Sequence, residues 1–374
     1  LGQPQGLPVQ SIALALAFFS LLLVGACSPA DSTAVEPAKG FAVSPAQERP
    51  APPASVDSAA GDTLPFCSLS RYEVFLGEYA EPSGRRLLVL RRAVCDSMGG
   101  DTARYWLVDM ESLRTHWREL SATQVRAADW QELERTYVHA PYMRLRRYLL
   151  RQNKGKLLGA GLSRCEGAAG WALTMDLCPS QHRWDSLLLS EDLPRRYAAQ
   201  MAAAPLPVAV AISAGWLRGH RRALQWLREQ RQYAITWVNH SDRHPYREGD
   251  SLHRNFLLSP DVRLDSELEA VERIFCEQGW ELSLFYRFPG LVSDSVLYRQ
   301  IVDRGLIPLS TDSWLAKGQM PTAGSIALIH LNGNEPEGLR LLREWLHSEK
   351  SADLPLLSLR EQVAAWVLRL AVLQ

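Results

Sequence analysis

Residues 206–240 read LPVAVAISAGWLRGHRRALQWLREQRQYAITWVNH, and this stretch decides the fold. An apolar run, LPVAVAIS, precedes an amphipathic stretch at 217–231, and a second apolar run, AITWVNH, follows it. Short apolar runs are typical of buried strands, and the pattern between them is typical of a helix. A strand–helix–strand unit of this kind predicts two parallel strands in one sheet.

The same alternation continues from Gly170 to about residue 350. The further strand candidates are WALTMD, LSLFYRFP, GLIPLS and SIALIHL, and the further helix candidates are Asp265–Glu277, Ser295–Asp303 and Glu337–His347. Repeated strands and helices favour an α/β fold with a parallel sheet or barrel. In such folds the reactive residues gather at the carboxyl ends of the strands.

Residues 64–164 have a different pattern. RYEVFLGEY and RRLLVLRRAVC are separated by EPSG, which predicts a β-hairpin, and YWLVDM is another strand candidate. Helical patterns follow at Ser121–Glu134 and Tyr142–Gln152. We interpret 64–164 as an α+β region whose role the sequence does not disclose, 165–350 as the barrel, and 351–374 as a C-terminal docking helix, apolar on one side only.

The N-terminal segment predicts export. Ser11–Ala26 is apolar and runs directly into Cys27, which suits a signal peptide better than a membrane-spanning helix. Gly25 and Ala26 before Cys27 resemble a bacterial lipobox, so residues 1–27 are expected to be a lipoprotein signal peptide with its lipobox. Cleavage is expected before Cys27, and the cysteine is expected to carry lipid. A plain cleaved signal peptide is the alternative. We expect a chain anchored to the bacterial envelope by this lipid and facing the periplasm.

Residues 28–63 are rich in Ala, Pro and Ser and have almost no large apolar side chains, so a disordered tether is expected there. Export also changes how the cysteines are interpreted, because disulfides persist outside the cytoplasm. Nearest-neighbour pairing predicts the bonds Cys67–Cys95 and Cys165–Cys178 and leaves Cys276 buried and free, although the sequence does not determine this connectivity.

Composition excludes one class of partner. The 41 basic and 41 acidic side chains balance, so there is no electrostatic case for binding nucleic acid. Twelve tryptophans suit contacts with sugar rings, although core packing is the commoner reason for so many.

Polar residues mark the ends of the predicted strands: Asp176, His240, Arg287, Asp312 and His330. His240 and His244 are four residues apart, so on a helical turn both imidazoles would lie on one face and could bind one metal ion.

Five motifs follow one another in the chain. They are LTMDLCP at 173–179, HSDRHP at 240–245, Arg287-Phe288-Pro289, Asp312 with Trp314 in STDSWLAKG, and Leu328-Ile329-His330. In this order they resemble the polysaccharide deacetylase family of NodB type. The resemblance covers residues 165–350 and diverges in its first motif.

The resemblance implies a distorted (β/α) barrel and a metal-dependent hydrolase that removes acetyl groups from an acetylated polysaccharide, cutting carbon–nitrogen or ester bonds. It implies a divalent metal, zinc, on His240 and His244, which would polarise the acetyl carbonyl and activate water. It also implies a base at Asp176 and an acid at His330. Arg287 would orient Asp176, with Asp312 in the supporting network.

The resemblance implies a pocket for the acetyl methyl group with Trp314 and Leu328 as its walls. Phe288 and Pro289 of the third motif are further substrate-binding candidates. Asn332 in the loop HLNGNEPEG would contact substrate, or else belong to an ordinary barrel loop, as would Asn334 and Glu335.

One residue departs from the family pattern. Leu177 stands where the family has the aspartate that binds the metal, and a leucine is no ligand. Asp176 could turn to the metal, or Cys178, which shares a strand face with Asp176, could donate a thiolate. The alternative to an enzyme is a non-catalytic carbohydrate-binding member of the same fold. The presence of Asp176, Arg287 and the three histidines favours the enzyme.

Overall fold

The structure is a computed structural model that describes residues 64–152, 155–180 and 182–370, all within one unit of the chain, residues 59–374. The expected signal peptide, lipobox and tether lie outside the described residues. Within the described residues, no helix is both long and apolar enough to span a bilayer.

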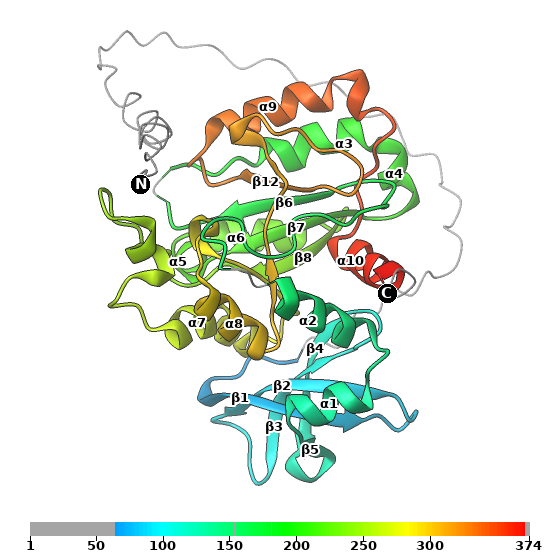
Figure 1. The fold of residues 1–374 in the computed structure, drawn as a ribbon, viewed down its shortest axis with the longest axis vertical. Helices are drawn as coiled ribbons and strands as arrows, with labels where there is room; N and C mark the ends of the chain where they lie inside the picture. The colour runs from blue at the N-terminus through cyan, green and yellow to red at the C-terminus, as the bar shows by residue number, and fades with distance from the viewer. Residues whose placement is uncertain (1–63, 153–154, 181, 371–374) are drawn as a thin grey trace, which may run out of the picture. The chain divides into compact units, whose positions relative to one another are not determined.

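The larger sheet has seven strands in the order β10-β9-β8-β7-β6-β12-β11, and every neighbouring pair is parallel. Figure 1 labels four of them, β12, β6, β7 and β8, which follow one another in this order. Its strands are β6 (Ala172–Leu177), β7 (Leu206–Ile212), β8 (Tyr233–Asn239), β9 (Phe285–Arg287), β10 (Ile307–Leu309), β11 (Ser313–Trp314) and β12 (Ile326–His330). The central strands are buried on both faces, which explains their continuous apolar runs. The predicted α/β fold is confirmed, and the sheet curls into a half-barrel.

Helices follow the strands as expected. They are α3 (Leu193–Arg196), α4 (Ala198–Ala203), α5 (Ala214–Gly219), α6 (Arg221–Glu229), α7 (Leu264–Glu277), α8 (Ser295–Asp303), α9 (Pro336–Leu346) and α10 (Leu359–Leu370). A π-helical turn at Leu188–Asp192 leads into α3, and short 3₁₀ turns lie at Ala122–Gln124, Leu252–Arg254, Phe256–Leu258, Pro289–Leu291, Leu315–Lys317 and Glu349–Ser351. The single helix predicted at 217–231 is two helices, because the backbone of His220 is not helical (φ −127°, ψ 43°).

A segment that precedes β6 covers the seam between β10, at one edge of the sheet, and the β12–β11 pair at the other edge. The Leu162 amide donates to the Pro308 carbonyl, and the Cys165 amide donates to the Gly324 carbonyl, both at 2.8 Å. This segment therefore joins the two sides of the half-barrel through isolated bridges at Leu162 and Arg164.

The smaller sheet is formed by residues 69–127 and has the order β4-β3-β2-β1-β5, all antiparallel. Its strands are β1 (Leu69–Ala80), β2 (Arg86–Cys95), β3 (Thr102–Val108), β4 (Thr115–Ser121) and β5 (Val125–Ala127), and its helix is α1 (Trp130–Thr136). The predicted hairpin β1–β2 is confirmed.

The helix predicted at Ser121–Glu134 is wrong over most of its length. Ser121 caps a single 3₁₀ turn through a capping box with Gln124, and the chain then pairs with β1 as β5. The helix α1 begins only after Asp129, whose side chain accepts the Glu132 amide. Because β5 pairs with β1, the first half of the predicted helix is not helical.

A buried ion pair fastens the smaller sheet to α7. Two guanidinium nitrogens of Arg91 lie 2.8 and 2.9 Å from the two carboxylate oxygens of Glu272, and both side chains are 1% exposed. The Tyr72 hydroxyl donates to the same carboxylate at 2.7 Å. In contrast, α2 (Pro141–Gln152) packs against α8 and α10, so it is part of the helical layer of the larger sheet.

One predicted disulfide is present and the other is wrong. Cys67 and Cys95 are bonded, whereas Cys165, Cys178 and Cys276 are free and buried. Cys165 precedes β6 and Cys178 follows it, so the length of the strand, about 20 Å, separates the two thiols. Closeness in sequence did not mean closeness in space here, because an extended strand lies between them.

Candidate active site at the carboxyl ends of the strands

Strand register brings the predicted residues to one edge of the sheet. β6 and β12 are parallel, and Asp176 lies directly opposite His330 in their register. Asn239, at the end of β8, lies opposite Tyr286 of β9, so His240 and Arg287 come next to each other. The carboxyl ends of four strands therefore converge, as expected for a parallel α/β sheet.

Asp176 is held by Arg287, as predicted. Arg287 Nη1 donates to Asp176 Oδ1 at 3.1 Å, and Arg287 Nη2 donates to the Ser310 carbonyl. Burial lowers the pKa of Arg287 below its usual value, although Asp176 and Cys178 oppose this effect. The other carboxylate oxygen, Asp176 Oδ2, lies 3.7 Å from His240 Nε2. One side of the carboxylate is anchored, and the other faces the histidines.

The histidine motif is a loop and not a helical turn. Ser241 and His244 have positive φ angles of 71° and 51°, so the geometry that the four-residue spacing suggested is wrong. The two imidazoles nevertheless meet, with ring centroids 5.0 Å apart. Their approach depends on the loop conformation rather than on helical periodicity.

Glu267 of α7 holds this loop, a role that no local sequence pattern indicated. Its carboxylate accepts hydrogen bonds from Ser241 Oγ at 2.6 Å and from the amides of Asp242 and Arg243 at 3.0 and 2.9 Å. Burial raises the pKa of Glu267, but the bonds from Ser241 and Arg243 outweigh it and lower the pKa below its usual value. This buried carboxylate thus accepts the hydrogen bonds of loop amides that a helix would pair within its own backbone.

Each histidine of the pair has a defined environment. His240 is 1% exposed, and its Nδ1 lies 3.0 Å from the Arg287 carbonyl, so Nδ1 carries the proton and Nε2 faces the site. Burial lowers the pKa of His240 more than Asp176 raises it, which favours the neutral ring. The His244 ring packs edge-on against Phe256, with centroids 5.5 Å apart. Phe256 can lie there because Gly290 has no Cβ, which would be 2.4 Å from its ring.

Cys178 completes a cluster with these histidines. Its Sγ lies 3.3 Å from His240 Nε2, and one donor atom each of Cys178, His240 and His244 lie within 4.8 Å of one another. Burial raises the pKa of the thiol, but His244 and His330 outweigh it and lower the pKa of Cys178 to about 7. The thiol therefore belongs to the site and not to a disulfide.

His330 has a carboxylate partner that the family resemblance did not imply. Its Nδ1 lies 2.7 Å from Glu335 Oε2, an ion-pair contact whose alignment is poor for a hydrogen bond. Trp314 Nε1 donates to the same oxygen at 2.8 Å. Burial lowers the pKa of His330, but Cys178 and Glu335 together raise it well above its ordinary value. The imidazolium form of His330 is favoured at neutral pH.

The structure places Asp312 outside this group, contrary to its expected role beside Asp176. Its carboxylate accepts from Arg164 Nη1 at 2.8 Å, from Ser325 Oγ at 3.2 Å and from the Ile326 amide at 3.1 Å. Arg164 belongs to the segment that covers the seam. Asp312 therefore joins that segment to the start of β12.

The substrate-binding candidates divide in the same way. Trp314 and Leu328 lie opposite each other in the β11–β12 register, and Leu328 shares a strand face with His330, as a wall of the site requires. Phe288 is 1% exposed and packs in the core against Tyr286 and Tyr298, so it presents no surface to a ligand.

Pro289 and Asn332 are also buried. Asn332 Nδ2 donates to the Cys178 carbonyl at 2.9 Å, and Asn332 Oδ1 accepts from the Asn334 amide. Asn332 thus fastens the end of β12 to the end of β6. Both polar atoms of its side chain are used in these bonds, so neither is directed to a substrate.

Leu177 faces away from the site. Alternation along β6 puts Asp176 and Cys178 on one face and Leu177 on the other, where it is fully buried in the main apolar core. Leu177, the residue that differs from the family pattern, therefore packs in the core of this chain.

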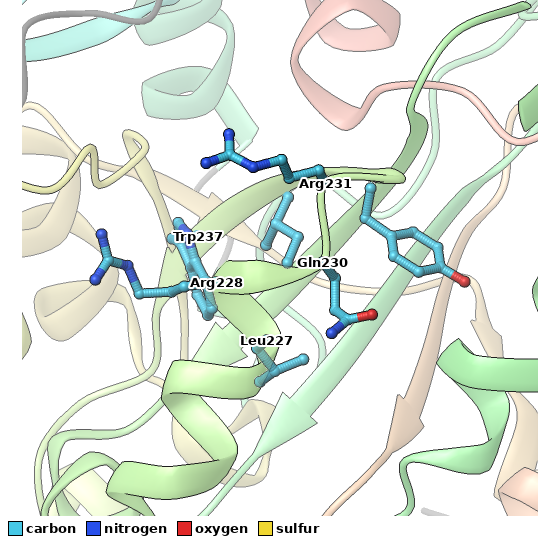
Figure 2. Close-up of a pocket in the computed structure, with 7 residues that line it drawn as sticks. Leu227, Arg228, Gln230, Arg231 and Trp237 are labelled. Atoms are coloured by element: carbon cyan, nitrogen blue, oxygen red, sulfur yellow. The ribbon is translucent and has the colours of Figure 1, made fainter. Parts of the chain in front are cut away.

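A surface hollow in the described part of the chain lies away from this site. It measures about 320 Å³ and is lined by Leu227, Arg228, Gln230, Arg231, Tyr233, Ile235 and Trp237 (Figure 2). It lies where α6 ends and β8 begins, whereas His240 follows the other end of β8, about 20 Å away. The hollow has no contact with the titratable cluster.

No family model matches this chain. A family 4 carbohydrate esterase from Bacillus anthracis is similar at 20% identity, over 59% of this chain and 91% of that one, with a TM-score of 0.39. PdaA of Bacillus subtilis, a family 4 carbohydrate esterase, is similar at 13% identity, over 53% and 80% of the two chains, with a TM-score of 0.35.

A family 4 pseudoenzyme from Bacillus anthracis is similar at 15% identity, over 55% of this chain and 70% of that one, with a TM-score of 0.37. The solved structures that resemble this chain thus include both carbohydrate esterases of family 4 and a pseudoenzyme of that family.

Proposed function

We propose that this chain is a hydrolase that removes acetyl groups from an extracellular or envelope polysaccharide. The observation that carries the proposal is the convergence of Asp176, His240, His244 and His330, from three different segments, at one edge of the sheet. The reaction needs both histidines of the pair to face the same site as Asp176 and His330.

The chain's own groups suit the two proton transfers of the reaction. Water adds to the acetyl carbonyl carbon, the bond from that carbon to the sugar nitrogen or oxygen breaks, and acetate leaves. Asp176 Oδ2, with Oδ1 anchored by Arg287, accepts the proton of the water. His330, favoured as imidazolium, donates a proton to the departing amine or alkoxide.

The donor set at His240 and His244 fits a divalent metal. His240 is buried, its neutral form is favoured, and its Nε2 faces the site, all of which a metal-binding imidazole requires. When bound, such an ion polarises the acetyl carbonyl and lowers the pKa of water. The Leu177 side chain has no atom that can bind a metal. Of the three metal ligands that the family resemblance implies, this chain therefore has two, His240 and His244.

Acetate release tests the proposal. The purified full-length chain is incubated with acetylated chitooligosaccharides and with an O-acetylated oligosaccharide, after loading with zinc, and acetate is measured. We expect release from one of the two classes, lowered about 10²- to 10⁴-fold in His330→Gln and in Asp176→Asn. No release from either class by correctly folded, metal-loaded protein contradicts the proposal.

The rival function is carbohydrate binding without catalysis, and the replacement at position 177 favours it. This function predicts that oligosaccharide binding survives a chelator and survives His330→Gln. Isothermal titration with the same oligosaccharides, with and without the chelator, measures this binding. The acetate assay on the same samples separates the two functions, because a hydrolase site needs its metal for turnover.

We further propose export and lipid attachment at Cys27. The apolar run before Cys27 supports this, and so does the Cys67–Cys95 disulfide, because disulfides persist in oxidising compartments. Labelled palmitate should be incorporated by the wild type in bacterial cells and not by Cys27→Ala. Equal labelling of both would contradict attachment at Cys27.

A further inference from the structure

We propose that the thiolate of Cys178 is the third protein ligand of the metal, in place of the family's carboxylate. The inference rests on the proposed function only in assuming that this site works with a metal ion. It assigns the chain a Cys-His-His centre, which is a different donor set from one aspartate and two histidines.

Strand geometry explains why residue 178, and not residue 177, supplies the ligand. Side chains alternate along β6, and Leu177 points into the core while Cys178 returns to the face of Asp176. Cys178 Sγ lies 3.3 Å from His240 Nε2, and the three donor atoms of the set lie within 4.8 Å of one another. Ligands about 2.0–2.3 Å from one zinc ion lie within such distances of each other.

The surrounding residues hold the three ligands in place. The Arg287 carbonyl fixes the tautomer of His240, and Phe256 packs against the ring of His244. Asn332 Nδ2 donates to the Cys178 carbonyl and so holds the backbone that carries the thiol. Partners of this kind orient metal ligands and raise their affinity.

The other free cysteines show that this environment is special to Cys178. Cys165 and Cys276 are buried among apolar residues, and burial raises the pKa of each thiol to about 12. Of the three free cysteines in the described part of the chain, only Cys178 belongs to a group of potential metal ligands.

The exchange of ligands has chemical consequences. A thiolate carries the same single negative charge as the carboxylate that it replaces, so the net charge of the ligand set is kept. Thiolate favours zinc and disfavours magnesium, calcium and manganese, which prefer oxygen donors. Three protein ligands also leave a coordination position free, as catalytic zinc sites do, and Asp176 Oδ2 is 3.7 Å from His240 Nε2 on the same side.

Cobalt binding by the full-length chain tests the inference without reference to activity. Co²⁺ is titrated under anaerobic conditions into the wild type and into Cys178→Ser, Cys178→Asp and Cys165→Ser. We expect one Co²⁺ per chain and an intense near-ultraviolet band from thiolate-to-cobalt charge transfer, in the wild type and in Cys165→Ser. The band should be absent from Cys178→Ser and Cys178→Asp.

Affinity and bond lengths give two independent readouts. Loss of a partner that only orients a ligand costs about 10- to 100-fold in affinity, so loss of a ligand in Cys178→Ser should weaken zinc binding by more than about 100-fold. Cys178→Asp should recover part of this loss, since a carboxylate is also a ligand. X-ray absorption of the zinc protein should show one sulfur at about 2.3 Å beside nitrogens at about 2.0–2.1 Å.

The outcomes separate this inference from the proposed function. Cobalt bound without a charge-transfer band, or a band that survives Cys178→Ser, overturns the thiolate ligand. Failure of the folded wild type to bind zinc or cobalt overturns it as well. Acetate release is measured on the same samples. Acetate release by a chain without a zinc–sulfur bond would refute Cys178 as a ligand but would still support the proposed hydrolase function. Cys165→Ser shows whether loss of any buried thiol would have the same effect.

Discussion

Nδ1 of His330 lies 2.7 Å from Oε2 of Glu335, and Trp314 Nε1 donates to that same oxygen at 2.8 Å. His330 ends β12, and Glu335 precedes α9 directly, so the loop between them returns to place the carboxylate beside Nδ1 of the ring. Glu335 is therefore the carboxylate that supports His330, whereas Asp312 contacts Arg164 and the start of β12.

Glu335→Gln should therefore lower the rate of acetate release. The variant removes the negative charge that favours the imidazolium of His330, but leaves the ring in place. We expect a loss of about 10- to 100-fold in kcat, smaller than the loss of about 10²- to 10⁴-fold expected on removing the acid itself. Asp312→Asn is the matched control, and its kcat should stay close to that of the wild type. Equal losses in the two variants would contradict the role of Glu335.

Leu177→Asp should destabilise the chain without restoring a metal ligand. Leu177 is fully buried in the apolar core, on the strand face opposite Cys178. Loss of a buried leucine alone costs about 2–5 kcal/mol, and an unpaired carboxyl adds to this cost. Urea unfolding should show a loss of at least about 3 kcal/mol, against less than about 1.5 kcal/mol for Leu177→Met. A gain of zinc affinity in Leu177→Asp would mean that residue 177 turns toward the site.

Glu267→Gln should change how stability depends on pH. Hydrogen bonds from Ser241 and Arg243 lower the pKa of Glu267 in the folded chain below its value in the unfolded chain. The carboxylate therefore stabilises the fold above the unfolded pKa, and this contribution disappears as the pH falls through the folded pKa. The melting temperatures of wild type and variant should differ at neutral pH and converge in acid. A difference that stays constant over this range would show that the charge of Glu267 does not matter.

Arg91→Leu should loosen the smaller sheet from α7. It leaves the carboxylate of Glu272 buried without its bidentate partner, which costs about 3–5 kcal/mol. The double variant Arg91→Leu with Glu272→Leu should be less destabilised than Arg91→Leu, because no charge then remains buried. Guanidinium unfolding of the two single variants and the double variant measures this. A double variant whose loss equals the sum of the single losses would show that the ion pair adds no coupling.

Local sequence patterns determined most of the elements of this protein. The apolar runs of β6, β7, β8 and β12 and the amphipathic patterns of α7, α8 and α9 were sufficient to predict an α/β fold. Asp176, His240, Arg287 and His330 were found because residues at the carboxyl ends of parallel strands must lie close together. These inferences hold because strand and helix periods are local properties of the backbone.

Only the tertiary structure decided which side chains meet. Glu267 is 26 residues from Ser241 in the chain, and no spacing rule connects them. Cys178 contacts His240, 62 residues away, and not Cys165, because an extended strand carries the two thiols apart. The pattern at 121–134 favoured a helix, but pairing of β5 with β1 overrode that preference. Contacts between distant segments depend on register, loop conformation and packing, and these arise only when the whole sheet has formed.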